Sequence, residues 1–269
     1  MKETTYQDYP WELYDLDYEG FEADVLLYRG LLRGRARAVL ELACGTGRIL
    51  IPLARDGHRV TGLELVSGML QVSRAKIATE GPEVRSRIDL RVGDMRDFDL
   101  GRRFDVVLLP RKTCLLLGSD EEYACTFERV HAHLEPGGLF LLDAFRPHEA
   151  VFALFDGRWI ERYERVRPGT GERVIRSQRV VHDAARRGIE SRHRWVIVGA
   201  DGAERVRSLD LRKHYVEPEE LRPMLETAGF EVEEAWGSYE KGGMDGAPVL
   251  DPHYPAWVES TALFCCRRG

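Results

Sequence analysis

From about residue 36 to residue 146 the chain alternates short apolar runs with stretches of helical periodicity. We predict strands at residues 38–42, 58–64, 88–92, 105–109 and 139–142. Helices are predicted to begin near Arg48 and to span residues 69–79 and 121–134, with a turn at residues 136–138. Strands that alternate with helices indicate a parallel sheet with helices on both faces.

The pattern changes between about residues 158 and 215, where four strand-like stretches follow one another. Turn residues at 183–188 and 200–202 separate these stretches in the manner of hairpins. We therefore predict an antiparallel sheet inserted after the fifth parallel strand. The α/β pattern resumes with a helix over residues 218–228, which Gly229 ends, and with strands at residues 230–236 and 258–266.

Composition excludes several classes of partner. The net charge of −6 argues against a nucleic-acid partner, because phosphates require a basic surface. The chain has no apolar run of about 18 residues, and its first residues lack the apolar core of a secretory signal. We expect neither a membrane span nor a membrane partner. The five cysteines form no CxxC pair, which favours reduced thiols in a cytoplasmic protein.

No metal site is expected. His131 and His133 lie two residues apart in a predicted helix, so their side chains point in different directions.

A glycine-rich turn follows the first predicted strand. It reads Glu41-Leu42-Ala43-Cys44-Gly45-Thr46-Gly47. A strand that ends in glycines and opens a helix presents free backbone N–H groups to a ligand, and small residues allow close approach. By itself this turn fits any nucleotide-like ligand, a dinucleotide included. The dinucleotide fingerprint has a third glycine where this chain has Leu50.

Acidic residues end the next two predicted strands. Glu64 closes the second strand, where a carboxylate can accept hydrogen bonds from ribose hydroxyls, and Asp94 follows the third. Ligands of open α/β sheets bind along the carboxyl edge of the sheet, so the glycine turn, Glu64 and Asp94 converge on one crevice. Each carboxylate alone is as well explained as a loop charge or a helix cap. Together they favour a nucleoside site.

These motifs resemble those of the class I S-adenosylmethionine-dependent methyltransferases. Residues 41–48 are similar to the first motif of that family, residues 60–64 with Met69 and Leu70 to the second, and residues 93–96 to its adenine-binding segment; residues 104–107 and 134–138 match its fourth and fifth strand regions. The resemblance covers roughly residues 10–145 and the last helix and strand pair. Two positions depart from the family pattern: Glu64 stands where Asp is commoner, and Val66-Ser67-Gly68 replaces a Ser-Pro-Glu-like turn.

The resemblance implies an α/β fold with a Rossmann-like seven-stranded sheet. We expect three parts: an N-terminal helical cap at residues 1–35, the cofactor-binding domain at residues 36–146 and 216–269, and an inserted antiparallel β lobe at residues 147–215 that covers the substrate.

The resemblance also implies which residues meet S-adenosylmethionine. They are Tyr14, Glu41, Ala43, Cys44, Gly45, Thr46, Gly47, Glu64, Leu65, Met69, Asp94, Met95, Leu109 and Pro110. The glycine turn would lie against the methionyl and ribose portions, and Glu64 would hold the ribose diol. Asp94 would meet the adenine amino group and Leu65 would pack on the adenine. Tyr14 belongs to a segment that folds over the cofactor in related enzymes.

The implied reaction is direct displacement, in which a nucleophile attacks the methyl group and S-adenosylhomocysteine is the product. Positioning supplies most of the catalysis. A hydroxyl, phenol or carbon nucleophile needs a general base, whereas a neutral amine does not. His214 is the candidate base, although a surface or buried structural histidine explains it better. The candidate substrate-binding residues are Tyr18, Arg111, Asp143 and Tyr215.

We expect a small-molecule acceptor, such as a sugar, amino acid or secondary metabolite, methylated on nitrogen, oxygen or carbon. The fourth strand ends in Leu108-Leu109-Pro110-Arg111-Lys112 and lacks the Asp/Asn-Pro-Pro-Tyr pattern of nucleic-acid methyltransferases. Two alternatives stay open: an NAD(P)-dependent oxidoreductase, and a cofactor-binding interaction protein without catalysis. The sequence does not name the acceptor, and it leaves a homodimer open.

Overall fold

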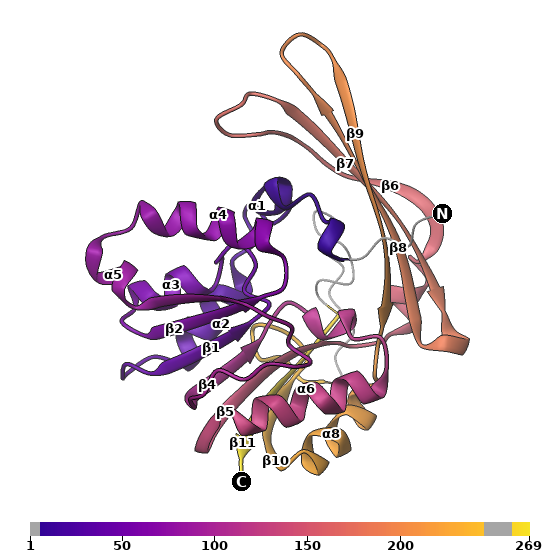
Figure 1. Ribbon diagram of the computed structural model, residues 1–269. Helices are drawn as coiled ribbons and strands as arrows, with labels where there is room; N and C mark the ends of the chain where they lie inside the picture. Colours follow the sequence, from indigo (N-terminus) through magenta and orange to yellow (C-terminus); the bar gives the residue numbers. More distant parts are fainter. Residues whose placement is uncertain (1–5, 245–259) are drawn as a thin grey trace.

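The computed structural model describes residues 6–244 and 260–269 (Figure 1). Its helices are η1 (Tyr6–Asp8), η2 (Trp11–Leu13), α1 (Tyr14–Asp17), α2 (Ala23–Leu31), α3 (Leu50–Arg55), α4 (Ser67–Ala78), α5 (Pro82–Ser86), η3 (Thr113–Leu116), α6 (Asp120–Ala132), α7 (Glu149–Phe152), η4 (Ala184–Arg186) and α8 (Pro218–Thr227). Its strands are β1 (Ala38–Leu42), β2 (Arg59–Glu64), β3 (Ile88–Val92), β4 (Phe104–Leu109), β5 (Leu134–Phe145), β6 (Asp156–Val166), β7 (Arg173–Asp183), β8 (Gly188–Val198), β9 (Glu204–His214), β10 (Phe230–Trp236) and β11 (Thr261–Arg268). Within these residues no helix has both the length and the apolar character that crossing a membrane requires.

Seven strands form one sheet in the order β10-β11-β5-β4-β1-β2-β3. Strands β1 to β5 run parallel, and β11 lies antiparallel between β5 and β10. The predicted Rossmann-like α/β fold is confirmed. Because β1 pairs with both β2 and β4, the glycine turn leaves the sheet at its centre, beside the ends of the strands that carry the other predicted site residues.

Helices cover both faces of this sheet. Successive residues of a strand point to opposite faces, so Val39 packs with Tyr28 of α2 and Leu53 of α3, whereas Leu40 belongs to the apolar cluster that contains Phe127 of α6. All five side chains are almost fully buried. The three layers that the alternating pattern predicts are therefore present.

A second, antiparallel sheet has the order β6-β7-β8-β9 and is inserted after β5. It stands away from the α/β part in Figure 1, and both predicted hairpin turns are found between its strands. In β8 every second residue from Ile189 to Ile197 is buried, which gives the sheet one inward face. This face turns toward the N-terminal segment and the end of β4.

The junction between the fourth and fifth parallel strands differs from the sequence prediction. Helix α6 ends at Ala132, and β5 begins at Leu134 and continues through residues 136–138, which were predicted as a turn. The pairing of β5 with β4 is irregular there, and Gly137 adopts a φ of 72°. The proline and glycines thus form an irregularity inside a longer strand. The predicted last strand at residues 258–266 starts at Thr261, and residues 258–259 lie outside the described residues.

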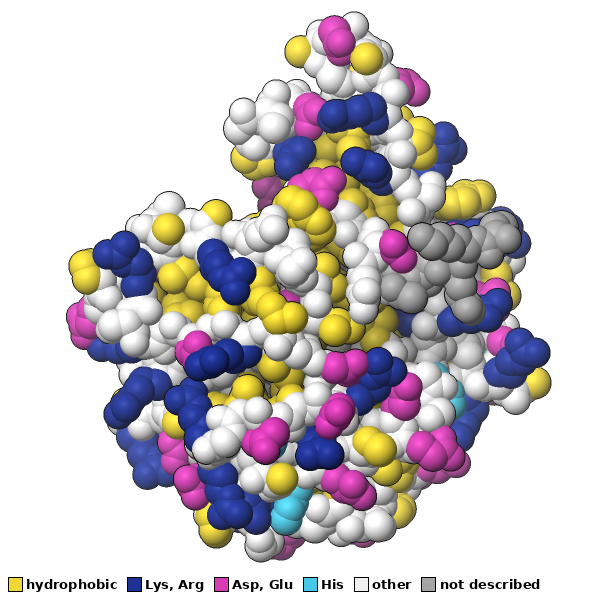
Figure 2. Space-filling model, viewed as in Figure 1, with side chains coloured by type: hydrophobic (Ala, Val, Ile, Leu, Met, Phe, Trp, Pro, Cys, Tyr) yellow, Lys and Arg dark blue, Asp and Glu magenta, His cyan; other side chains and the backbone are white. Residues whose placement is uncertain are grey.

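The N-terminal segment packs against the inward face of the antiparallel sheet. Tyr9, Leu13 and Leu16 are buried in one apolar cluster with Trp195 of β8 and Leu209 of β9. Figure 2 shows hydrophobic side chains around the junction between the protruding sheet and the α/β part, and basic and acidic side chains interspersed below it. The apolar cluster joins residues that are far apart in the sequence.

Asp17 is the polar centre of that contact. Its buried carboxylate accepts hydrogen bonds from the hydroxyl groups of Tyr9 and Tyr163 and from Trp195 Nε1, at 3.1 Å from Oδ1. Arg176 Nε lies 3.5 Å from Oδ1. A buried carboxylate is tolerated only when such donors surround it. Asp17 therefore fixes the N-terminal segment against β6, β7 and β8.

Replacing Asp17 with Ala would leave these donors and the Arg176 charge without their acceptor. We expect Asp17→Ala to lower the free energy of unfolding by about 3–5 kcal/mol, the usual effect of breaking a buried ion pair. Urea unfolding measures the change. Asp210→Ala is the control, since Asp210 makes an exposed pair with Arg192 at 3.4 Å that is worth about 0–1 kcal/mol. Equal losses in the two variants would contradict this role of Asp17.

Candidate active site

The glycine turn after β1 has a backbone that favours glycine. Gly45 and Gly47 adopt φ values of 54° and 81°, and Ala43 adopts 52°. A Cβ atom at Gly47 would lie 2.8 Å from Ser73 Oγ of α4, which is too close for an ordinary contact. The small residues are thus required by the conformation of the turn, in which Gly45, Thr46 and Gly47 are buried.

Glu64 joins the glycine turn to the end of β2. Its Oε2 accepts the N–H of Gly45 at 2.9 Å, and its Oε1 accepts the N–H of Val66 at 2.8 Å. Burial raises the pKa of Glu64, while these backbone hydrogen bonds oppose the rise. A carboxylate has about four acceptor positions, which is more than these backbone donors occupy.

Asp94 lies at the end of β3, where its side chain is 28% exposed. Arg96 donates to it, at 2.7 Å from Oδ2, and also contacts Glu122 Oε1 at 2.6 Å. This hydrogen-bonded pair lowers the pKa of Asp94 and keeps it ionised. Leu65 is 41% exposed, whereas Met95 is half-buried against the core and Met69 is fully buried in the N-terminal apolar cluster.

The N-terminal segment lies over the glycine turn. Ring atoms of Tyr14 lie 3.8 Å from the position that a Cβ atom of Gly45 would take. Next to it, Asp15 accepts a hydrogen bond from Thr46 Oγ1 at 2.6 Å and pairs with Lys76 Nζ at 2.9 Å. The segment that is expected to fold over the cofactor therefore lies against the glycine turn in this structure.

The turn after β4 is strained. Leu109 and Pro110 are buried, and the next two residues, Arg111 and Lys112, both have left-handed backbones, with φ of 61° and 55°. This conformation costs roughly 1–2 kcal/mol for each residue other than glycine. Strain of this kind concentrates at functional sites.

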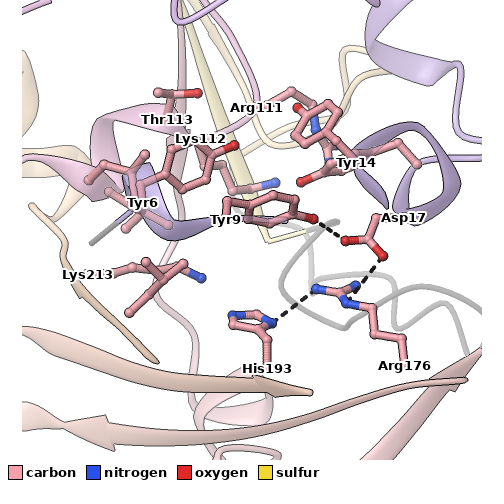
Figure 3. A pocket seen from close by; sticks show the side chains of 14 residues that line it. Tyr6, Tyr9, Tyr14, Asp17, Arg111, Lys112, Thr113, Arg176, His193 and Lys213 are labelled. Atoms are coloured by element: carbon pink, nitrogen blue, oxygen red, sulfur yellow. Dashed lines mark hydrogen bonds and ion pairs between the residues drawn. The ribbon is translucent and has the colours of Figure 1, made fainter. Parts of the chain in front are cut away.

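A cavity opens between this turn, the N-terminal segment and the antiparallel sheet (Figure 3). The cavity and the solvent space at its mouth together measure about 810 Å³. Its walls are formed by Tyr6, Tyr9, Tyr14, Asp17, Tyr18, Arg111, Lys112, Thr113, Leu115, Leu116, Arg176, His193, Leu211 and Lys213. The wall contains four Arg and Lys side chains and one carboxylate, that of Asp17, which gives the cavity a positive character.

His193 lies in the cavity wall as a neutral imidazole. Burial lowers its pKa well below the usual value, and the charge of Arg176 adds to that effect. Arg176 Nη2 donates to His193 Nδ1 at 3.1 Å, so Nε2 carries the proton and faces Ser191 Oγ at 3.0 Å. Both ring nitrogens are engaged, and His193 therefore positions Arg176 and does not accept a proton.

Two buried lysines also line the cavity. Burial lowers the pKa of Lys112 to about 8. Burial, assisted by the charge of Arg176, lowers the pKa of Lys213 to about 7. Asp143 lies behind Lys112, accepts a hydrogen bond from the Tyr239 hydroxyl and has a pKa raised by burial. The lysines are thus poised to exchange protons near neutral pH.

Among the predicted substrate and catalytic residues, the cavity wall contains Tyr18 and Arg111 but neither His214 nor Tyr215. His214 Nε2 contacts Asp120 Oδ1 at 2.8 Å at the start of α6. The hydroxyl of Tyr215 contacts His182 Nε2 at 2.9 Å. The base role of His214 stays a prediction, and this position does not favour it.

Sequence reasoning missed the inward residues of the antiparallel sheet, Arg176, His193 and Lys213, as well as Asp17. The available signal was the period of two in β7 to β9: a charged residue in phase with buried apolar neighbours faces inward. Lys213 is in phase with Leu209 and Leu211.

Comparison with known proteins identifies a methyltransferase domain in this chain. Residues 39–138 match the family model of a methyltransferase domain. The chain is 35% identical over 139 residues to dTDP-3-amino-3,6-dideoxy-alpha-D-glucopyranose N,N-dimethyltransferase of Streptomyces fradiae, which covers 49% of this chain and 51% of that enzyme. It is 29% identical to the cypemycin N-terminal methyltransferase of Streptomyces sp, over 76% of each chain. The match thus spans about half the length of the first relative.

The whole fold also matches a solved structure. The CcbJ methyltransferase from Streptomyces caelestis superimposes with a TM-score of 0.78 and 25% identity over 100% of both chains. The chain thus contains a methyltransferase domain and has the fold of a methyltransferase. The glycine turn lies within the matched domain, and the inserted antiparallel sheet lies within the fold match to the CcbJ methyltransferase.

The residues of this methyltransferase fit S-adenosylmethionine. The glycine turn has the small residues that close approach of a ligand requires and is buried beneath the N-terminal segment, while Glu64 keeps acceptor positions for ribose hydroxyls. Glu41 is buried at the end of β1, and its Oε2 has no hydrogen-bond partner among the described residues. Asp94 presents an ionised carboxylate just after the end of β3. The contacts that we predicted for the individual cofactor residues remain proposals.

The burial of Lys213 should make the stability of the folded protein depend on pH. Its folded pKa of about 7 lies below its value in the unfolded chain, so folding is penalised at pH 7 and below, and the penalty is relieved as pH rises from about 7 to 10. We expect Lys213→Met to raise Tm at pH 6–7 and the gain to shrink toward pH 10. For domains of 150–250 residues, a gain of about 1 kcal/mol corresponds to roughly 2–4 °C.

Thermal unfolding of both proteins across this pH range measures the effect. Arg205→Met is the control, since Arg205 lies at the other end of the same strand, β9, and its side chain is largely exposed. A gain in Tm that is constant with pH would contradict the buried, titrating state of Lys213.

Proposed function

We propose that this methyltransferase transfers a methyl group from S-adenosylmethionine to the amino nitrogen of a small acceptor, such as an amino sugar or a related natural product. The relative from Streptomyces fradiae is named for N,N-dimethylation of an amino sugar, and the cypemycin enzyme for methylation of an N-terminus. None of the relatives reported above is an oxidoreductase. The favoured acceptor is therefore a primary or secondary amine.

One observation carries this proposal. Tyr14 lies against Gly45 of the glycine turn and also lines the cavity, where its ring centroid is 4.6 Å from that of Tyr18. The cofactor turn and the cavity thus share a wall. An acceptor in the cavity would meet the cofactor beside these rings, which is the proximity that direct displacement requires.

When bound, S-adenosylmethionine supplies an electrophilic methyl group, which leaves as the acceptor nitrogen forms its bond to carbon and the electron pair of the broken bond remains on sulfur. The cavity favours the reactive form of an amine. Positive charge on Lys112 and Arg176 disfavours a protonated ammonium nearby, so the acceptor nitrogen keeps its lone pair. The aromatic walls hold the acceptor in place.

Lys213 in the cavity wall can remove the proton from the methylated nitrogen. The methylated nitrogen carries a proton that must leave before a second methylation. Lys213, with a pKa of about 7, is able to take up that proton and release it to solvent near neutral pH. No base is needed before the attack on the methyl group, because a neutral amine is already nucleophilic.

Several expectations from the sequence stand as part of this proposal. They are the division into a cap, a cofactor domain and a lobe, a cytoplasmic location and a homodimer. The outer strand β6 supports self-association, since Trp159, Ile160 and Val166 are 51%, 45% and 65% exposed.

The activity is tested with a panel of acceptors. We expect methylation of dTDP-linked 3-amino sugars and no methylation of the matching 3-hydroxy sugars, with mass spectrometry of the products as the measurement. Methylation of the hydroxyl compounds alone would contradict nitrogen as the acceptor atom. Binding of S-adenosylhomocysteine without transfer to any member of the panel would favour the non-catalytic alternative.

The cofactor contacts are tested with Asp94→Ala and Glu64→Ala. Removing a charged hydrogen-bond partner typically costs ~1.5–3 kcal/mol, so each variant should bind S-adenosylhomocysteine roughly 10- to 150-fold more weakly. Isothermal titration calorimetry measures the affinity. Asp89→Ala is the matched control for Asp94, because Asp89 lies earlier in β3 and pairs with Arg91 at the surface. Unchanged affinity in both folded variants would show that the contacts are misplaced.

A further inference from the structure

Arg111 is a buried guanidinium with unused donors. Its side chain is 10% exposed, and neither Nε nor Nη1 has a hydrogen-bond partner among the described residues. The group packs on the rings of Tyr18 and Phe21, at 4.6 and 4.4 Å from their centroids. Buried donors without acceptors carry a desolvation penalty, so this arrangement is favourable only when a ligand supplies the acceptor.

The nearby carboxylates are directed to other donors. Asp24 Oδ2 lies 3.8 Å from Arg111 Nε, beyond hydrogen-bond distance, while both of its oxygens bind Arg48. Asp143 accepts from Tyr239 through Oδ2, and its Oδ1 makes no hydrogen bond to a described residue. Both carboxylates lie close enough to offset part of the Arg111 charge without filling its hydrogen-bonding positions.

The charges around Arg111 leave room for one anion. The cations are Arg48, Arg111 and Lys112, and the facing carboxylates are Asp24 and Asp143. Burial holds Glu41, which lies near Arg48, toward its neutral form by raising its pKa. The cluster therefore has about one excess positive charge when Asp143 is ionised.

The position of Arg111 indicates which anion it meets. It follows β4, the neighbour of β1 in the sheet, so its turn lies beside the glycine turn. In Figure 3 Arg111 lies next to Tyr14, the residue that covers Gly45. The cations that line the opposite, lobe side of the cavity are Arg176 and Lys213. Arg111 thus belongs to the cofactor side of the cavity.

We propose that Arg111 binds the carboxylate of the amino-acid half of the cofactor through its guanidinium group, in which Nε and Nη1 have no hydrogen-bond partner among the described residues. This inference rests on the proposed function for the identity of the cofactor. The planar fork of a guanidinium matches a carboxylate in a bidentate fashion, which an ammonium cannot reproduce. Because Tyr18 and Phe21 hold the guanidinium plane, the donors are oriented before the ligand arrives.

The experiment compares two ligands that differ in the amino-acid half. S-adenosylhomocysteine has that half, whereas 5′-methylthioadenosine keeps the adenosine and the thioether sulfur and lacks the carboxylate. Affinities of wild type, Arg111→Gln and Arg111→Lys for both ligands are measured by isothermal titration calorimetry. Circular dichroism and thermal unfolding check the fold of each variant.

We expect Arg111→Gln to lower the affinity for S-adenosylhomocysteine about 10-fold or more, as the loss of a charged hydrogen-bond partner does. The affinity for 5′-methylthioadenosine should change by less than about twofold, because this ligand lacks the carboxylate. Arg111→Lys should restore only part of the loss. Arg192→Gln, on an exposed position of β8, should leave both affinities unchanged. Asp94→Ala, in contrast, should lower the affinity for both ligands, because both contain the adenine.

Other outcomes overturn the proposal. Equal weakening of both ligands by Arg111→Gln would show a merely structural role. Unchanged S-adenosylhomocysteine affinity would show that Arg111 does not hold the carboxylate. If wild type binds neither ligand, the proposed function itself fails, and that result is recognised before any variant is made.

Discussion

The buried carboxylate of Asp17 organises the geometry of the active site. Taking a carboxylate out of water is unfavourable unless donors surround it, and here the donors come from the N-terminal segment and from three strands of the antiparallel sheet. Because Asp17 ends α1, the same contact fixes the helix that carries Tyr14. The cover of the glycine turn and the wall of the cavity are thereby set by one group of hydrogen bonds.

The electrostatics of the cavity follow from that arrangement. Asp17 directs its charge to Arg176, which in turn holds His193 neutral, and the lysines on either side are desolvated. The result is a buried space that is positive but whose lysines exchange protons near neutral pH. Such a space favours a neutral amine over an ammonium ion, in agreement with an acceptor nitrogen that must offer its lone pair.

Much of the fold was predictable from the sequence because it depends on local patterns. Apolar runs that end in glycines or acidic residues mark the strand ends, and these placed Gly45, Glu64 and Asp94 along one edge of the sheet. The family resemblance led to the expectation that the segment of Tyr14 covers the cofactor, and in the structure Tyr14 lies against the glycine turn. The four strands of the inserted sheet followed from turn residues and alternation.

The acceptor side was not predictable in the same way, since it depends on which face of a strand turns inward. A shift of one residue moves a side chain to the other face. In β9 Lys213 lies in the cavity wall, whereas the adjacent His214 points to α6 and pairs with Asp120. Asp17 also gave no local signal, because its partners are up to 178 residues away in the chain.

A crystal structure of the protein with S-adenosylhomocysteine tests the central claim most directly. We expect the ligand on the glycine turn beneath Tyr14, with its sulfur facing the cavity between the β4 turn and the antiparallel sheet. A ligand bound elsewhere, or one whose sulfur faces away from this cavity, would contradict the proposed meeting of cofactor and acceptor.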